Sequence, residues 1–366
     1  MGDVMHVILA TAEVVEATTD SINWWTLIIG FAGGLALFLY GMDRMTESLR
    51  VVVGDRARQV LSKLTSNRFT GLLTGAGVTA VVQSSSVTTV LLVGFVSAGL
   101  MTFTQTIPVI FGSNIGTTIT AQIIAFNVAA WALGLVAVGY LMAVVGKRHN
   151  RRAQGSALVG LGLIFLGMTV MADAMEPLRT YQPFIDAMEA LDSLFLAIIV
   201  GALFTALVQS SSATTGVVIV LAGQGLISLE AGVALVLGAN IGTGITAMLA
   251  AIGKPRNAQR VAVAHVVFNV LGVLIWLPFV DLLVTLVSNI GGGLQREIAN
   301  AHTIFGVVHA LLFLPFVTPF AALVTRLVPD KPHVGALAPR YVDASLLSPP
   351  SLALAKARME LLRLAA

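Results

Sequence analysis

The chain alternates long apolar runs with short polar segments, and the lengths of the runs predict membrane helices. A helix needs about 20 mostly apolar residues to cross the hydrocarbon core of a bilayer. Runs of this kind lie at 23–42, 105–125, 128–146, 155–173, 229–251, 259–280 and 303–327. The predicted fold class is therefore an all-α polytopic membrane protein.

Two further apolar stretches, 69–100 and 194–227, are too long for one span, and the same polar tetrad interrupts each of them halfway. The first tetrad is Gln83-Ser84-Ser85-Ser86 and the second tetrad is Gln209-Ser210-Ser211-Ser212. Each half-stretch is too short to cross a bilayer, so each stretch predicts a re-entrant helical hairpin with the tetrad at its tip.

The two tetrads belong to an internal repeat. Shifting residues 75–122 by 126 positions onto 201–248 gives 21 identities in 48 positions without a gap. The aligned polar segments include Gly112-x-Asn114-Ile115-Gly116-Thr117 and Gly238-x-Asn240-Ile241-Gly242-Thr243. Corresponding Gly-interrupted segments in two halves are typical of transporter sites. We predict that repeat 1 covers 23–150 and has a broken span at 105–125. Repeat 2 is predicted to cover 151–280, with a broken span at 229–251. An extra span is predicted at 303–327.

The positive charges predict how the chain is oriented. Clusters of Lys and Arg follow the first, third, fifth and last spans. Because such clusters concentrate in cytoplasmic loops, we place all four in the cytoplasm. The N-terminal tail (1–22) is then extracytoplasmic, the C-terminal tail (328–366) is cytoplasmic, and the two repeats have inverted topology. Arg44 and Arg50 are counted here as loop charges.

Composition agrees with this class and excludes others. The chain is 57% hydrophobic and 11% charged, with a mean hydropathy of +0.91, whereas soluble domains are about 25% charged. It has no Cys, which excludes disulfides and thiolate metal sites. The sequence pI of about 9.4 does not predict a nucleic-acid partner, because the positive residues lie in short loops between apolar runs.

The tetrads carry the chemistry of an anion site. At a hairpin tip the second helix presents free backbone N–H groups and the positive end of its dipole, beside serine hydroxyls. Two such tips facing each other would surround a tetrahedral oxyanion. The predicted anion ligands are Ser84, Ser85, Ser86, Ser210, Ser211 and Ser212.

Neutral oxygens in the same segments predict a cation site. They suit a hard, weakly charged ion such as sodium rather than a transition metal. The candidates are Gln83, Thr88, Thr89, Asn114, Thr117, Gln209, Thr214, Thr215, Asn240 and Thr243. The hairpins and broken spans lack Asp, Glu, Lys and Arg apart from Glu230, which favours sodium coupling over a proton relay.

Structural explanations compete with these assignments. Any single Thr can simply satisfy a backbone carbonyl of its own helix. His265 and Asn269 have the spacing of a gating or proton-sensitive pair, but an interhelical hydrogen bond is the favoured interpretation. For His302 and His309 a structural role is likewise favoured.

The duplicated QSSS and GxNIGT segments resemble the sodium/phosphate cotransporter type II family. The resemblance covers about 25–330 and implies paired hairpins in inverted repeats, phosphate as the cargo, sodium as the coupling ion and no other cofactor. It implies binding at the two tetrads, with Asn114, Thr117, Asn240 and Thr243 in addition. The absence of Cys and the short segment 174–193 resemble the bacterial branch, which implies the bacterial inner (plasma) membrane. Residues 340–366 resemble the start of a PhoU-like domain.

The expected function is a sodium-coupled phosphate symporter that works by alternating access. The alternatives are a transporter of another oxyanion such as sulfate or arsenate, and a phosphate-sensing membrane anchor. We do not expect an enzyme, because there is no GxSxG motif and the serine clusters lie on no strand. A homodimer is left open.

Overall fold

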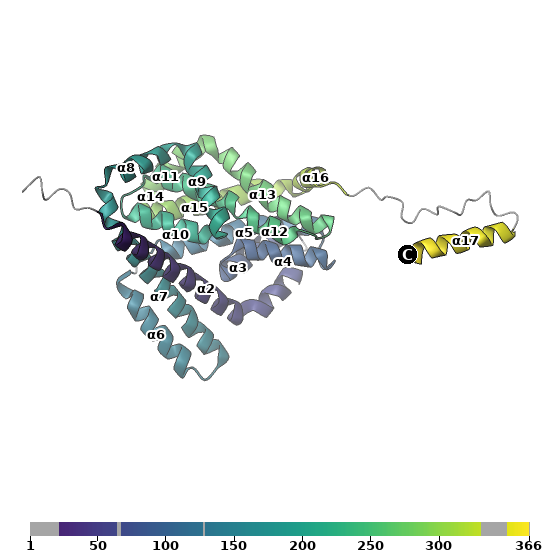
Figure 1. Cartoon of the computed structure of the whole chain (residues 1–366), viewed down its shortest axis with the longest axis horizontal. Coiled ribbons are helices and arrows are strands. Elements are labelled where there is room, and N and C mark those ends of the chain that lie inside the picture. The colour runs from purple at the N-terminus through teal and green to yellow at the C-terminus, as the bar shows by residue number, and fades with distance from the viewer. Residues whose placement is uncertain (1–21, 64–66, 127–128, 331–349, 366) are drawn as a thin grey trace, which may run out of the picture. The chain divides into compact units, whose positions relative to one another are not determined.

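The computed structural model describes residues 22–63, 67–126, 129–330 and 350–365, and the regular structure in these ranges is helical (Figure 1). The predicted all-α class is confirmed. The chain divides into a unit that ends at Val328 and a second unit that begins at Pro329. The second unit contains α17 (Pro350–Ala365). Residues 1–21 and 331–349 lie outside the described ranges, so the predicted N-terminal tail and the PhoU-like start remain predictions.

The first unit consists of two successive halves and three C-terminal helices. The first half contains α2 (Trp24–Lys63), α3 (Arg68–Val82), α4 (Ser85–Ser97), α5 (Phe103–Ile124) and α6 (Ala132–Val145). The second half contains α7 (His149–Met175), α8 (Gln182–Glu189), α9 (Leu194–Val208), α10 (Ser211–Gly223), α11 (Leu229–Gly242), α12 (Gly244–Ala251) and α13 (Arg256–Trp276). The remaining helices are α14 (Val280–Ile290), α15 (Leu294–Phe313) and α16 (Val317–Leu327).

Six of the predicted spans are long and apolar enough to cross a membrane within the described ranges. The exception is 128–146, where α6 has only 14 residues. At 1.5 Å per residue such a helix is about 21 Å long, shorter than the hydrocarbon core of about 30 Å. Residues Ala129–Trp131 form a 3-10 turn, and the helix ends at Val145. The apolar run is therefore longer than the helix that it predicts.

The two spans predicted to be broken are more regular than expected. α5 is continuous, and α11 and α12 are separated only at Thr243. The polar side chains bind carbonyls of their own helix instead of breaking it. The Thr117 hydroxyl donates to the Ser113 carbonyl at 3.0 Å, and the Thr243 hydroxyl donates to the Asn240 carbonyl at 2.6 Å. The second helix is interrupted where Gly244 replaces the Thr of the first repeat, since glycine weakens a helix.

Both hairpins have the predicted helix–break–helix form, with arms of 15 and 13 residues in each. Their first arms contact the following helix backbone to backbone. A Cβ on Gly75 would lie 2.1 Å from the Val109 carbonyl oxygen, and a Cβ on Gly201 would lie 2.1 Å from the Leu235 oxygen. The two contacts are equivalent, because the 126-residue shift places Gly75 on Gly201 and Val109 on Leu235. Only glycine permits such an approach, so each hairpin has a fixed position on its neighbour.

The helices α2 and α7 lie against each other, with α6 along α7 (Figure 1). We refer to α2 and α7 as the frame. A Cβ on Gly34 would lie 2.8 Å from the Gly167 oxygen, and a Cβ on Gly41 would lie 2.6 Å from the Gly160 oxygen. The 126-residue shift pairs Gly34 with Gly160 and Gly41 with Gly167. This crossed pattern is what a two-fold relation between two helices produces.

Candidate functional site

The two hairpin tips have the same unusual backbone. Gln83 and Gln209 have φ of 58° and 57°, and they are the non-glycine residues with positive φ in the described ranges. Each ends its first arm in the left-handed conformation. Extended Ser84 and Ser210 then begin the second arm, and their hydroxyl oxygens accept from the amides of Val87 and Ala213 at 3.3 and 3.2 Å.

This geometry leaves backbone donors at each tip. The amides that follow the capping serine stand at the first two positions of α4 and α10, where a helix supplies no acceptor of its own. They belong to Ser85, Ser86, Ser211 and Ser212, whose side chains are buried. Each tip therefore combines amide donors, serine hydroxyls and the positive end of a helix dipole.

One cavity of about 340 Å³ brings the two tips together. All six predicted anion ligands line it, as do Gln83 and Gln209. Residues that are 126 positions apart in the sequence thus face a common space. The other lining residues are Leu39, Met42, Asp43, Thr46, Arg50, Val87 and Val208.

The remaining sodium candidates are buried but are not among the lining residues of this cavity. Several have protein partners. The Thr88 hydroxyl lies 2.8 Å from that of Thr79, and the Thr214 hydroxyl lies 2.6 Å from that of Thr205. The Asn240 amide donates to the carbonyl of Val236 at 3.2 Å. A cation at these oxygens would have to share them with existing hydrogen bonds.

Histidine 265 joins the two halves. Its Nδ1 lies 3.0 Å from the Thr89 hydroxyl and its Nε2 lies 3.3 Å from the Thr243 hydroxyl. One turn further along α13, Asn269 accepts a hydrogen bond from the Asn114 amide at 2.8 Å. The favoured interpretation, interhelical hydrogen bonding, is confirmed for both residues. A structural role also fits His309, whose Nε2 lies 3.1 Å from the Phe268 carbonyl.

Equivalent groups in the two halves differ in their contacts. Gln83 is buried, and its Oε1 accepts from the Thr120 hydroxyl at 2.7 Å. The corresponding Gln209 is exposed, and the hydroxyl of Thr246, the equivalent of Thr120, has no partner among the described residues. Likewise Thr89 bonds to His265, whereas the hydroxyl of Thr215 has no described partner. The local sequence is repeated, but these hydrogen bonds of the first half have no counterpart in the second half.

The helix α2 contributes residues to the cavity that were not among the predicted site residues. The helix continues to Lys63, so Arg50 lies on a helix and not in a loop. Asp43, Thr46 and Arg50 line the cavity beside Leu39 and Met42. The intervals of three, one, three and four residues are those of one helix face, and this pattern was present in the sequence.

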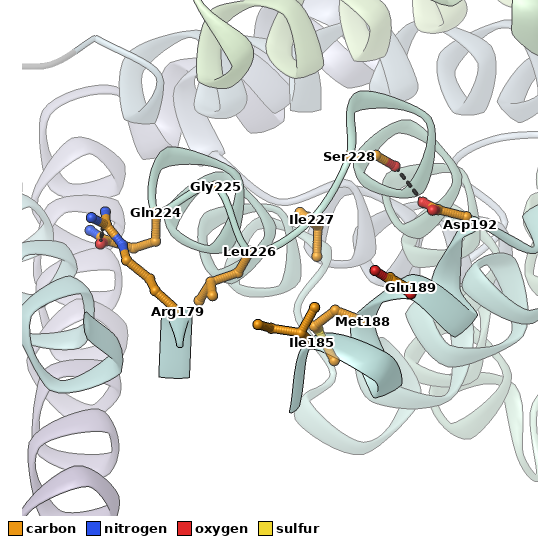
Figure 2. A pocket seen from close by; sticks show the side chains of 10 residues that line it. All are labelled: Arg179, Ile185, Met188, Glu189, Asp192, Gln224, Gly225, Leu226, Ile227 and Ser228. Atoms are coloured by element: carbon orange, nitrogen blue, oxygen red, sulfur yellow. Dashed lines mark hydrogen bonds between the residues drawn. The ribbon is translucent and has the colours of Figure 1, made fainter. Parts of the chain in front are cut away.

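A second cavity, of about 430 Å³, lies at the other end of α10 and contains none of the predicted ligands (Figure 2). Arg179, in the 3-10 turn Glu176–Arg179, donates to the side chain of Gln224. The Ser228 hydroxyl donates to the Asp192 carboxylate at 2.6 Å. These contacts connect the segment around α8 to the turn between α10 and α11.

Three relatives illustrate what the chain is similar to. It is 34% identical to "Uncharacterized protein YqeW" of Bacillus subtilis over 256 residues, which cover 69% of this chain and 82% of that protein. It is 31% identical over 340 residues to "Putative inorganic phosphate export protein YjbB" of Salmonella typhimurium, covering 92% of this chain and 62% of that protein. It is 26% identical over 388 aligned residues to "Sodium-dependent phosphate transport protein 2A" of Rattus norvegicus, covering 69% and 60%.

No solved structure matches the chain. The chain spans less than two thirds of the length of the YjbB and rat proteins. The sequence model of the Na+/Pi-cotransporter family matches residues 37–173 and 184–314, so that each match contains one tetrad and most of one half. The chain belongs to the Na+/Pi-cotransporter family.

Proposed function

We propose that this chain carries inorganic phosphate across the membrane and couples its movement to sodium ions by alternating access. The observation that supports the proposal most strongly is the meeting of the two tetrads at one cavity. Membership of the Na+/Pi-cotransporter family supports phosphate as the cargo.

The cavity has the chemistry that phosphate requires. Phosphate presents oxygen acceptors in several directions, and the two tips supply hydroxyl and amide donors from opposite halves. Backbone N–H groups at a helix N-terminus bind phosphate without a proton-transfer step. Ser85, Ser86, Ser211 and Ser212 are therefore proposed as the innermost ligands, with Ser84 and Ser210 beside them.

Sodium coupling is the finer part of the proposal. Gln83 and Gln209 line the cavity, and the other proposed sodium ligands are buried neutral side chains of the same hairpins and of the helices that follow them. The rat relative is named for sodium dependence, whereas the Salmonella relative is named for phosphate export. Export without sodium is therefore the second candidate function.

Transport by purified protein in sealed proteoliposomes tests the proposal. We expect an inward sodium gradient to drive uptake of labelled phosphate, and an equal potassium gradient to fail. Ser85→Ala and Ser211→Ala should each lower uptake at limiting phosphate by about ten-fold, since a hydrogen bond to a charged group contributes about 1.5–3 kcal/mol.

Ser97→Ala is a matched control. Ser97 lies on the same helix as Ser85, but its hydroxyl donates to the Val93 carbonyl at 2.7 Å, away from the cavity. Phosphate exchange that does not depend on sodium would support export without sodium. Stronger competition by sulfate or arsenate than by phosphate would identify another oxyanion as the cargo. Phosphate binding without any exchange would indicate a sensing anchor and contradict the proposal.

A further inference from the structure

The helix α2 forms one wall of the cavity, and this wall contains charged side chains, whereas the side chains of both tetrads are neutral. We propose that Arg50 is a direct ligand of the transported phosphate and sets the preference of the site for the doubly charged ion. This inference rests on the proposed function and adds to it a residue outside both repeated motifs.

The placement of Arg50 follows from one face of α2. Leu39, Met42, Asp43, Thr46 and Arg50 line the same cavity as both tetrads. This face is held against the second hairpin by Phe38, which is fully buried and whose ring fills the space beside Gly216. Phe38 lies four residues before Met42, so the helix is anchored close to the cavity.

The side chains along this face differ in their exposure, and Asp43 is exposed like Arg50. Phe38 and Met42 are buried, Thr46 is half-buried and Arg50 is exposed. Arg50 is thus an exposed residue that lines the cavity, and the proposal places its guanidinium group against an ion held between the tetrads. A guanidinium group binds phosphate through two parallel hydrogen bonds and keeps its charge at any physiological pH.

Charge balance supports a ligand role. Among the lining residues, Arg50 and Asp43 are the charged ones, and the serine and glutamine side chains are neutral. Asp43 is seven residues away, about 10.5 Å along the helix, so it does not pair directly with Arg50. Within the part of the chain that the structure describes, Arg50 has no ion pair. Its charge is thus available to an anion.

Arg44 shows the alternative, a positive charge used within the protein. It is also exposed on α2, but it lies 3.9 Å from the Glu47 carboxylate and donates to the Ser156 hydroxyl at 3.4 Å. It does not line the cavity. If Arg50 served only to orient the helix in the membrane, the two arginines would respond alike to loss of charge.

The test compares Arg50→Gln, Arg50→Lys and Arg44→Gln in sodium-driven uptake of labelled phosphate by proteoliposomes. We expect Arg50→Gln to raise the KM for phosphate by about ten-fold or more, because a charged hydrogen bond is lost. Arg50→Lys should recover part of the affinity, since lysine keeps the charge but not the paired geometry. Arg44→Gln should leave the KM unchanged.

The pH profile separates a ligand from a structural residue. Between about pH 6 and about pH 8 inorganic phosphate takes on its second charge. Wild type should gain affinity for total phosphate over this range, and Arg50→Gln should lose most of that gain. An unchanged KM and pH profile in Arg50→Gln, with wild type active, would refute the role of Arg50 alone. If wild type itself fails to transport phosphate, the proposed function fails instead.

Discussion

At the scale of single residues, Gln83 of the first tetrad has two tasks. Its backbone adopts the left-handed conformation that ends the first arm, at a cost of about 1–2 kcal/mol for a non-glycine residue. Glycine would avoid this cost but would lack the side chain. Gln83 uses its amide group to accept from Thr120 and to donate to the carbonyl of Ala80. Strained residues of this kind concentrate at functional sites.

The bond between Thr120 and Gln83 gives a prediction with a built-in control. Thr120→Val removes the donor to the buried Gln83 oxygen and should lower the free energy of unfolding by about 0.6–1.7 kcal/mol, the range for membrane hydrogen bonds. Thr246→Val, at the equivalent position of the second repeat, removes a hydroxyl without a described partner and should be neutral or stabilising. Thermal unfolding of both variants in detergent measures the difference, and equal losses would contradict it.

At the scale of the elements, the contact between α2 and α10 depends on a missing side chain. A Cβ on Gly216 would lie 2.3 Å from the Phe38 ring. Gly216→Ala should therefore destabilise the protein by about 1–3 kcal/mol through overpacking. Gly94→Ala, on the equivalent helix α4, meets nothing within 4 Å and should stabilise it slightly.

A second variant tests whether the contact itself is responsible. Phe38→Ala creates space beside Gly216, so combining it with Gly216→Ala should cost less than the sum of the two single changes. The non-additivity is measured as a double-mutant cycle of unfolding free energies. Strict additivity would show that Gly216 is required for another reason.

The sequence predicts these elements well where polar residues repeat and poorly where only apolar length is available. The tetrads locate both hairpin tips at the residue where each helix breaks. The GxNIGT segments lead to the wrong expectation for α5, because their glycines serve close packing and their threonines bind their own helix. Arg50 was missed because α2 continues beyond the apolar run that defines its membrane part.

At the scale of the whole molecule, the two cavities lie at opposite ends of α10. With 13 residues, this helix separates them by about 20 Å. The contacts of Arg179 with Gln224 and of Asp192 with Ser228 hold the turn after α10 to the α8 segment (Figure 2). Under the proposed alternating access, we expect these contacts to open and close as the hairpins move.

Cross-linking tests this requirement in a chain that has no cysteine of its own. In a double variant, Arg179→Cys with Gln224→Cys, treatment with a short thiol cross-linker should lower the rate of phosphate transport by about ten-fold or more. The reason is that this end of α10 can open only if the two residues separate. Cleavage of the cross-link should restore transport, and each single cysteine variant should be insensitive. Full transport by the cross-linked protein would show that this end of α10 stays in place.

The asymmetry between the halves is the feature that the sequence does not predict. Gln83 and Gln209 occupy equivalent positions, yet one is buried and bonded while the other is exposed. Identical local sequence cannot predict such a difference, because it depends on how each hairpin sits against the frame and the C-terminal helices. The same holds for Thr89 and Thr215, because only Thr89 has a histidine partner, His265 of α13, while the Thr215 hydroxyl has no described partner.

The crossing of α2 and α7 joins the two helices at their backbones. Gly34 meets Gly167 and Gly41 meets Gly160 with no side chain between the two backbones. Side chains at a contact can change rotamer and absorb a small displacement, whereas backbones in direct contact cannot. We therefore expect the two helices to move as one rigid unit, so that a change in bilayer thickness that tilts one of them also tilts the other.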